Sequence, residues 1–200
     1  MNKDHNSTPE SHDVTLESSQ HSHEAVLTPT GESRINRAIE DDDLKTLSSL
    51  LDNGADPNAL DNSGNLPLQL AAARGQIDCI DLLFGYGANP NRRDRKGNTA
   101  VHIAARCHQS DALIRLIRHD GDVNMPNLHG ETALHSAVRG MCWKKPDPRI
   151  FEILIAAGAW QNVVDGYGVT PSQIAKEEGF DAVARLLTAN PACPGSHRTT

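Results

Sequence analysis

The stretch Gly-Ala-Asp-Pro-Asn at residues 54–58 returns one unit later as Gly-Ala-Asn-Pro-Asn at residues 87–91. Weaker copies follow, as Gly-Asp-Val-Asn at 121–124 and as Gly-Ala at 158–159. A second turn phrase follows each copy and ends in a glycine, at Gly64, Gly97, Gly130 and Gly168. The first three of these glycines are evenly spaced, and the last step is longer. A fixed period of this length is typical of a linear array of stacked repeats, in which each unit contacts only its neighbours.

Between the turns, apolar residues recur at helical spacing and predict a pair of helices in each of five units. Small residues on the first helix of a pair let neighbouring units approach closely, and large residues on the second helix fill the space between them. The small residues are Ala71, Ala104, Ala137 and Ala175. We therefore expect an all-α repeat solenoid of helix-turn-helix units, joined by β-turns that project as fingers.

With these features in place, the chain resembles the ankyrin repeat family, whose unit is a β-turn and two antiparallel helices with a Thr-Pro-Leu-His-x-Ala signature. The closest copies of the signature are Thr-Ala-Val-His-Ile-Ala at 99–104 and Glu-Thr-Ala-Leu-His-Ser-Ala at 131–137, and partial copies lie at 66–69 and 170–173. The resemblance implies that His102 and His135 tie each helix start to the neighbouring turn by hydrogen bonds. Thr99, Thr132 and Thr170 are expected to cap helix N-termini.

The predicted organisation has three parts. Residues 1–32 form a disordered acidic leader rich in Ser and His, residues 33–190 form the ankyrin array, and residues 191–200 form a disordered tail. The array is divided into units at 33–60, 61–93, 94–126, 127–164 and 165–190, of which the first and the last are polar caps. The fourth unit carries five extra residues, which we place at 140–148 between its helices. His108 replaces the glycine usual at the end of a first helix, so we expect this turn to be strained or reshaped.

Composition and motifs disfavour several functions. A formal charge of -7 argues against a general role in coating nucleic acid, which needs clustered Lys and Arg. The four cysteines form no Cys-x-x-Cys pair, so no zinc site or disulfide framework is expected. The sequence shows neither a long apolar run nor a secretory signal, which leaves the cytosol or the nucleus. It also shows no nucleophile motif and no phosphate-binding loop, so we predict no enzyme, cofactor or metal site.

Basic and aromatic residues in the turns and first helices predict where a partner binds. The turn at 92–96 carries four cations, which would attract an acidic or phosphorylated partner, unless it is simply a solvated turn that pairs with the acidic leader. Trp143, in the insertion, is either an interface anchor or a residue that folds back over the longer loop. Tyr167 and Trp160, near the last turn, either extend the surface or pack between the last two units. The predicted partner-binding residues are Arg92, Arg93, Arg95, Lys96, Arg106, Arg139, Trp143 and Tyr167, with Arg106 and Arg139 at equivalent first-helix positions that extend the cations into a basic strip.

We predict a monomeric, non-catalytic protein–protein interaction module, which acts as an adaptor or a competitive inhibitor through its fingers and its helix groove. Its partner is another protein, with no direct contact to nucleic acid or membrane. Only ten residues follow the array, so we expect no second domain there. Ankyrin proteins that recruit ubiquitin ligases usually append a short helical box, which this sequence lacks, so we expect a blocker or a scaffold rather than a ligase adaptor. Three alternatives stay open: a nuclear transcriptional regulator docked on a DNA-binding factor, a secreted effector that binds a host protein, and an enzyme regulator whose partner supplies the chemistry.

Overall fold

The computed structural model describes residues 31–141 and 147–189 of the 200-residue chain. Within these ranges the chain forms ten α-helices and no β-strand. The helices are α1 (Gly31–Glu40), α2 (Leu44–Asp52), α3 (Pro67–Arg74), α4 (Ile77–Gly85), α5 (Ala100–Arg106), α6 (Ser110–Arg118), α7 (Ala133–Gly140), α8 (Arg149–Ala156), α9 (Pro171–Glu177) and α10 (Asp181–Ala189). The predicted disorder at 1–32 and 191–200 falls outside the described ranges, apart from the first two residues of α1.

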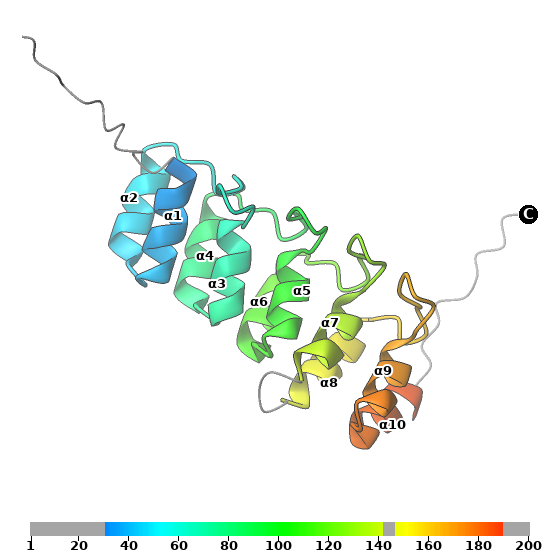
Figure 1. Ribbon diagram of the computed structural model, residues 1–200. Coiled ribbons are helices and arrows are strands. Elements are labelled where there is room, and N and C mark those ends of the chain that lie inside the picture. Colours follow the sequence, from blue (N-terminus) through cyan, green and yellow to red (C-terminus); the bar gives the residue numbers. More distant parts are fainter. Residues whose placement is uncertain (1–30, 142–146, 190–200) are drawn as a thin grey trace, which may run out of the picture.

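The helices stack as pairs along one axis (Figure 1). Each odd-numbered helix packs on the next odd-numbered helix, and α2, α4, α6 and α8 pack on one another in that order. The loops between pairs project from one side. We call the odd-numbered row the inner helices and the even-numbered row the outer helices. The predicted all-α repeat solenoid is therefore confirmed. The inserted residues lie between the end of α7 and the start of α8, and 142–146 are outside the described ranges.

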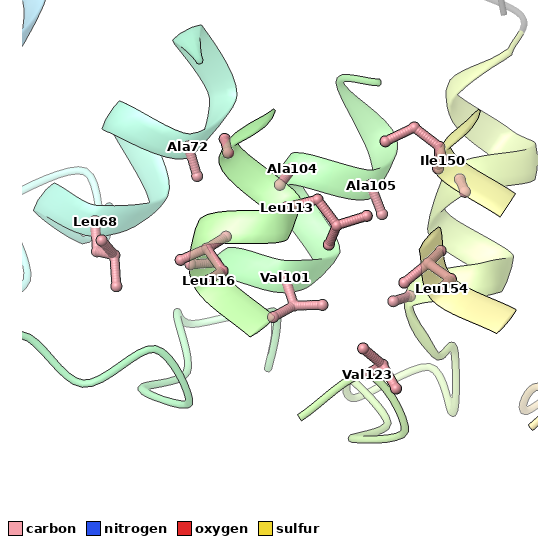
Figure 2. Packing of buried hydrophobic residues seen from close by; sticks show 14 of the residues in the cluster. Leu68, Ala72, Val101, Ala104, Ala105, Leu113, Leu116, Val123, Ile150 and Leu154 are labelled. Carbon is pink, nitrogen blue, oxygen red and sulfur yellow. The ribbon is translucent and has the colours of Figure 1, made fainter. Parts of the chain in front are cut away.

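Buried apolar side chains from both rows form one continuous core. Figure 2 shows Ala72 of α3 and Ala104 of α5 where these inner helices face each other, with Leu113 and Leu116 of the outer helix α6 entering the space beside them. All four side chains are fully buried. Small residues thus lie at the close approach of inner helices and large ones fill the remaining space, which is the division predicted from the alanine pattern.

One asparagine in each of the first three units joins its turn to the next turn. Asn91 donates from Nδ2 to the carbonyl oxygen of Asp120 (2.9 Å) and accepts from the backbone N–H of Asp122 (2.8 Å). Asn58 and Asn124 make the same pair of bonds one unit before and one unit after. Each of these amides holds two backbone groups of the following unit, so it fixes how successive units are aligned. The sequence shows that these turns contain asparagine, but the contact that the asparagines make between units was not predicted.

The two signature histidines connect helix starts to the next finger, as predicted. His102 Nδ1 accepts from the backbone N–H of Thr99 (3.2 Å), so Nε2 carries the proton and donates to the carbonyl oxygen of Glu131 (3.0 Å). His135 makes the same bonds, with Thr132 (3.1 Å) and with the carbonyl oxygen of Val169 (3.1 Å). In the second unit, Gln69 takes the place of the histidine, and its Nε2 donates to the carbonyl oxygen of Asn98 (2.6 Å).

These histidines make the stability of the array depend on pH. Burial lowers the pKa of His102 and of His135 below the ordinary histidine value, which is about 6.5 in an unfolded chain. Below a pH of about 6.5 the unfolded chain therefore binds more protons than the folded chain does. The stabilisation that is present above that pH is lost progressively as the pH falls towards and through the folded pKa. We expect the urea concentration at the unfolding midpoint to decrease when the pH is lowered from about 7.5 to about 5.5, a range that spans the ordinary histidine pKa of about 6.5.

The double variant His102→Gln with His135→Gln provides the control, because Gln69 already holds this position in the second unit. Its urea midpoint should change less over the same pH range than that of the wild type. Buried carboxylates with a lowered pKa, such as Asp165, lose their contribution to stability only at more acidic pH. They therefore do not affect the comparison of the two proteins over this range. Equal pH dependence in both proteins would contradict the role assigned to the two rings.

His108 keeps the backbone conformation that glycine adopts at this place. Its φ is 53°, close to the 70° of Gly75 in the second unit, so the turn is not reshaped and a non-glycine residue holds a left-handed conformation. The ring compensates through two contacts across the fourth unit. Nδ1 accepts from the backbone N–H of Asp147 (3.3 Å), and Nε2 donates to the carbonyl oxygen of Ala137 (3.1 Å). His108, in the turn after α5, therefore bonds both α7 before the insertion and Asp147 near the end of the insertion.

Candidate partner-binding surface

A hollow of about 280 Å³ lies between the inner helices α3 and α5 and two of the fingers. We number the fingers by unit: the second is 61–64, the third 94–97, the fourth 127–130 and the fifth 165–168. Its lining includes three cations and three apolar residues, namely Arg95, Lys96, Arg106, Leu70, Ala73 and Ile103. This set is called the basic hollow below. Three of the predicted partner-binding residues thus come together around one concave site.

The hollow exists because the second unit has a small residue where later units have arginine. Ala73 of α3, Arg106 of α5 and Arg139 of α7 hold the same position in three successive units. The methyl group of Ala73 leaves open the space that a long side chain would occupy. On the finger side, Arg95 lies over Gly64, where an added Cβ would meet the Arg95 Cδ at 2.7 Å. Arg95 is therefore held against the second finger.

The charge of the basic hollow is positive. Asp94 also lines it, but its carboxylate accepts from the backbone N–H groups of Lys96 (2.8 Å) and Asn98 (2.8 Å) and from Asn98 Nδ2 (3.1 Å). Within residues 31–141 and 147–189, none of Arg95, Lys96 and Arg106 makes an ion pair. All three side chains are exposed. A ligand with carboxylates would therefore meet cations that have no competing partner in this part of the chain.

Arg92 and Arg93 lie in the loop that leads to the third finger and do not line the hollow. Both are exposed. Arg93 is close enough to His102 for its charge to oppose protonation of that ring. The four cations predicted to act as one group are thus divided, with two in the hollow and two beside it.

Arg139 does not contribute a free charge to the basic strip. Its guanidinium bonds Glu131 through Nε (2.6 Å) and Asp165 through Nη2 (3.0 Å). The Asp165 side chain is 0% exposed, and burial acts to raise its pKa. The backbone N–H groups of Val169 and Tyr167 and the charge-assisted bond from Arg139 outweigh burial and hold that pKa below its usual range. The predicted strip is corrected accordingly: Arg139 holds the fourth and fifth fingers together.

Arg139→Ala is expected to lower the free energy of unfolding by about 1–3 kcal/mol, because it leaves the buried Asp165 carboxylate without its cation. Arg106→Ala, at the equivalent position of α5, should stay within about 0.5 kcal/mol of the wild type. Urea denaturation followed by circular dichroism measures both values. The assignment of Arg139 to the structure of the array is wrong if the two substitutions cost the same.

Beyond the basic hollow, the finger tips become apolar. Leu128 in the fourth finger is 71% exposed and Tyr167 in the fifth is 77% exposed. Tyr167 was predicted to belong to the surface, and its exposure favours that interpretation over packing between the last two units. Leu128 was missed, although a signal was available: it follows Arg95 by one full period, so it takes the same place in its finger. Trp143 lies outside the described ranges.

The third, fourth and fifth fingers are bonded edge to edge. The backbone N–H of Leu128 donates to the carbonyl oxygen of Lys96 (3.1 Å), and that of Gly166 donates to the carbonyl oxygen of His129 (2.7 Å). Gly97 and Gly130 permit this approach, because an added Cβ would lie 2.8 Å from the backbone nitrogen of Leu128 or of Gly166. The basic hollow and the apolar tips are consequently adjoining parts of one surface.

Metal sites and membrane-spanning helices are both absent from the described part of the chain. Residues 31–141 and 147–189 contain no group of three His, Cys, Asp or Glu side chains placed to hold a metal ion. The same ranges contain no helix with the length and apolar character needed to cross a membrane.

Comparisons with known proteins find repeats between residues 15 and 144 of the chain. The family model described as "Ankyrin repeats (3 copies)" matches residues 15–94, 35–127 and 86–144. Among curated proteins, the chain is similar to "Potassium channel AKT1" from Arabidopsis thaliana, with 50% identity over 46 residues. That match covers 23% of this chain and 5% of the channel, so the chain spans only a small part of that relative.

Proposed function

The chain belongs to the ankyrin repeat family, and from that premise we propose that it binds a partner protein through the basic hollow and the fingers, as an adaptor or a competitive inhibitor. Ankyrin repeats are generally non-catalytic modules for protein–protein interaction. The resemblance to the potassium channel covers 5% of that protein and supports the repeat fold, not ion conduction. We place the activity in the cytoplasm or the nucleus, with the protein acting as a monomer.

One observation carries the proposal: three exposed cations converge on a concave site in a chain whose net charge is -7. Like charges repel, so this local concentration opposes folding slightly unless a ligand of opposite sign compensates it. Arginine in particular pairs with carboxylates through two parallel hydrogen bonds. The partner is therefore a protein with an acidic surface. Arg92 and Arg93, beside the hollow, add to the same field and increase the rate of encounter.

Affinity capture from a lysate of the native source tests the proposal. The bait is the wild-type chain or one of two charge-reversed variants. The basic-hollow variant carries Arg95→Glu, Lys96→Glu and Arg106→Glu. The control, called the outer-helix variant, carries the same change of charge on α2, α6 and α10, as Lys45→Glu, Arg118→Glu and Arg185→Glu. Circular dichroism establishes that both variants keep the helical fold.

We expect a partner that the wild type and the outer-helix variant retain and that the basic-hollow variant loses by at least about tenfold, which corresponds to 1.4 kcal/mol. The proposal fails if all three baits recover the same proteins in the same amounts, because the cations of the hollow would then play no part in binding.

A further inference from the structure

We propose that the partner contributes an extended acidic segment whose carboxylates enter the basic hollow and whose next apolar side chains pack on Leu128 and Tyr167. The inference rests on the proposed function and adds to it the chemistry and the spacing of the segment recognised. Its three supports are the continuity of the surface, the composition of the finger tips and the repeat distance of the array.

Continuity comes from the backbone. Lys96 lines the hollow, and its carbonyl oxygen accepts from the backbone N–H of Leu128 at 3.1 Å. His129, the next residue, accepts from Gly166, which immediately precedes Tyr167. No flexible connection separates the charged and the apolar parts, so their spacing is fixed before binding. A partner that touches both parts loses less entropy than one that must first order the surface.

The composition of the finger tips changes along the array. The third finger presents Arg95 and Lys96, whereas the same two places hold Leu128 and His129 in the fourth finger and Gly166 and Tyr167 in the fifth. Exposed apolar side chains that adjoin one another mark interaction sites more often than scattered ones do. Tyrosine is also enriched among the residues that dominate binding energy. The sequence of chemistry along the surface is therefore basic, then aliphatic, then aromatic.

Repeat distance sets the spacing of the ligand. Packed helices lie about 8–10 Å apart, and an extended chain advances about 3.3 Å per residue, so one unit of the array corresponds to about three residues of ligand. The hollow precedes Leu128 by one unit and Tyr167 by two. In the ligand, we therefore expect one apolar residue about three positions from the acidic residues and a second about six positions from them. The ligand chain can run in either direction.

A random peptide library displayed on phage tests this spacing even while the partner is unidentified. The full-length wild-type chain is the selecting bait, and the basic-hollow variant removes peptides that bind elsewhere. A third protein, the finger-tip variant, carries Leu128→Ser and Tyr167→Ser. The enriched peptides are then synthesised with a fluorescent label, and their affinities for all four proteins, the outer-helix variant included, are measured by anisotropy.

The expected peptides combine Asp or Glu with apolar residues at the spacing given above. Their affinity should fall at least about tenfold, or 1.4 kcal/mol, with the finger-tip variant, and equally when serine replaces the apolar residues of the peptide. The outer-helix variant should bind as the wild type does. Enriched peptides without acidic residues, without apolar residues or without a fixed spacing overturn the inference, as does a failure to enrich any peptide.

Other occupants of the surface would be recognised in the same experiment. A dimer that forms in sedimentation runs of the wild type and is lost in the finger-tip variant would assign the apolar tips to a second copy of the chain. Peptide binding gained only after deletion of residues 1–30 would assign the hollow to the acidic leader. The two proposals also fail separately: if lysate capture needs the basic hollow but not the finger tips, the proposed function stands and this inference falls.

Discussion

Replacing Leu116 with alanine is expected to lower the free energy of unfolding by about 2–5 kcal/mol, the usual loss for a buried leucine. Leu116 is 0% exposed and lies on the outer helix α6, facing the inner helices (Figure 2). Neighbouring helices on both sides hold the space open, so it cannot collapse around the smaller side chain. Leu154 of α8 is equally buried, and Leu154→Ala should cost a similar amount.

Urea denaturation followed by circular dichroism measures these losses, and Leu128 supplies a matched control. Leu128→Ala removes the same atoms from a side chain that is 71% exposed, and should change stability by no more than about 0.5 kcal/mol. Because each unit depends on its neighbours, the stability lost in Leu116→Ala should shift the unfolding transition of the whole array. Similar midpoints for the Leu116 and Leu128 variants would contradict the helix faces described above.

Gly140→Ala is the second substitution with a large expected effect. Gly140 ends α7 where that helix meets α5, and a Cβ added there would overlap the backbone carbonyl oxygen of Arg106. A backbone atom cannot rotate away as a side chain can, so α7 must move from α5 and the packing between the third and fourth units suffers. Overpacking of this kind costs about 1–3 kcal/mol or more.

Gly85 provides the opposite case for comparison. It ends α4, and nothing lies within 4 Å of a Cβ added to it. Gly85→Ala should therefore leave the array unchanged or stabilise it by up to about 1 kcal/mol, because alanine loses less backbone entropy in a helix than glycine does. Thermal denaturation of the two variants gives the sign of each change. A Gly140→Ala protein as stable as Gly85→Ala would show that α5 and α7 do not approach as closely as described.

The fold could be predicted because every unit repeats the same local signals. Turn glycines, helical spacing and the Thr-x-x-His phrase at 99–102 and 132–135 each indicate the same structure, and their agreement across the units removes the ambiguity of any single one. The roles of His102 and His135 followed from the same signature. These features depend on residues close in sequence or one period apart, which a repeat makes visible.

The candidate site was predicted only in part, because its properties depend on contacts that differ between units. Arg106 and Arg139 hold equivalent positions, yet of the two only Arg139 makes ion pairs within residues 31–141 and 147–189, one of them to Asp165, 26 residues away. The basic hollow likewise depends on a small residue, Ala73, which gives no signal of its own. Leu128 was overlooked because a single leucine in a turn is unremarkable unless it is aligned with Arg95 one period earlier.

Hydrogen–deuterium exchange of the full chain, with and without the captured partner, tests the central claim most directly. The account predicts slower exchange on binding at 94–106 and 127–135, which hold the third and fourth fingers and the inner helices that follow them, and no change in the outer helices α2 and α6. Slower exchange confined to the outer helices, with the fingers unaffected, would contradict it.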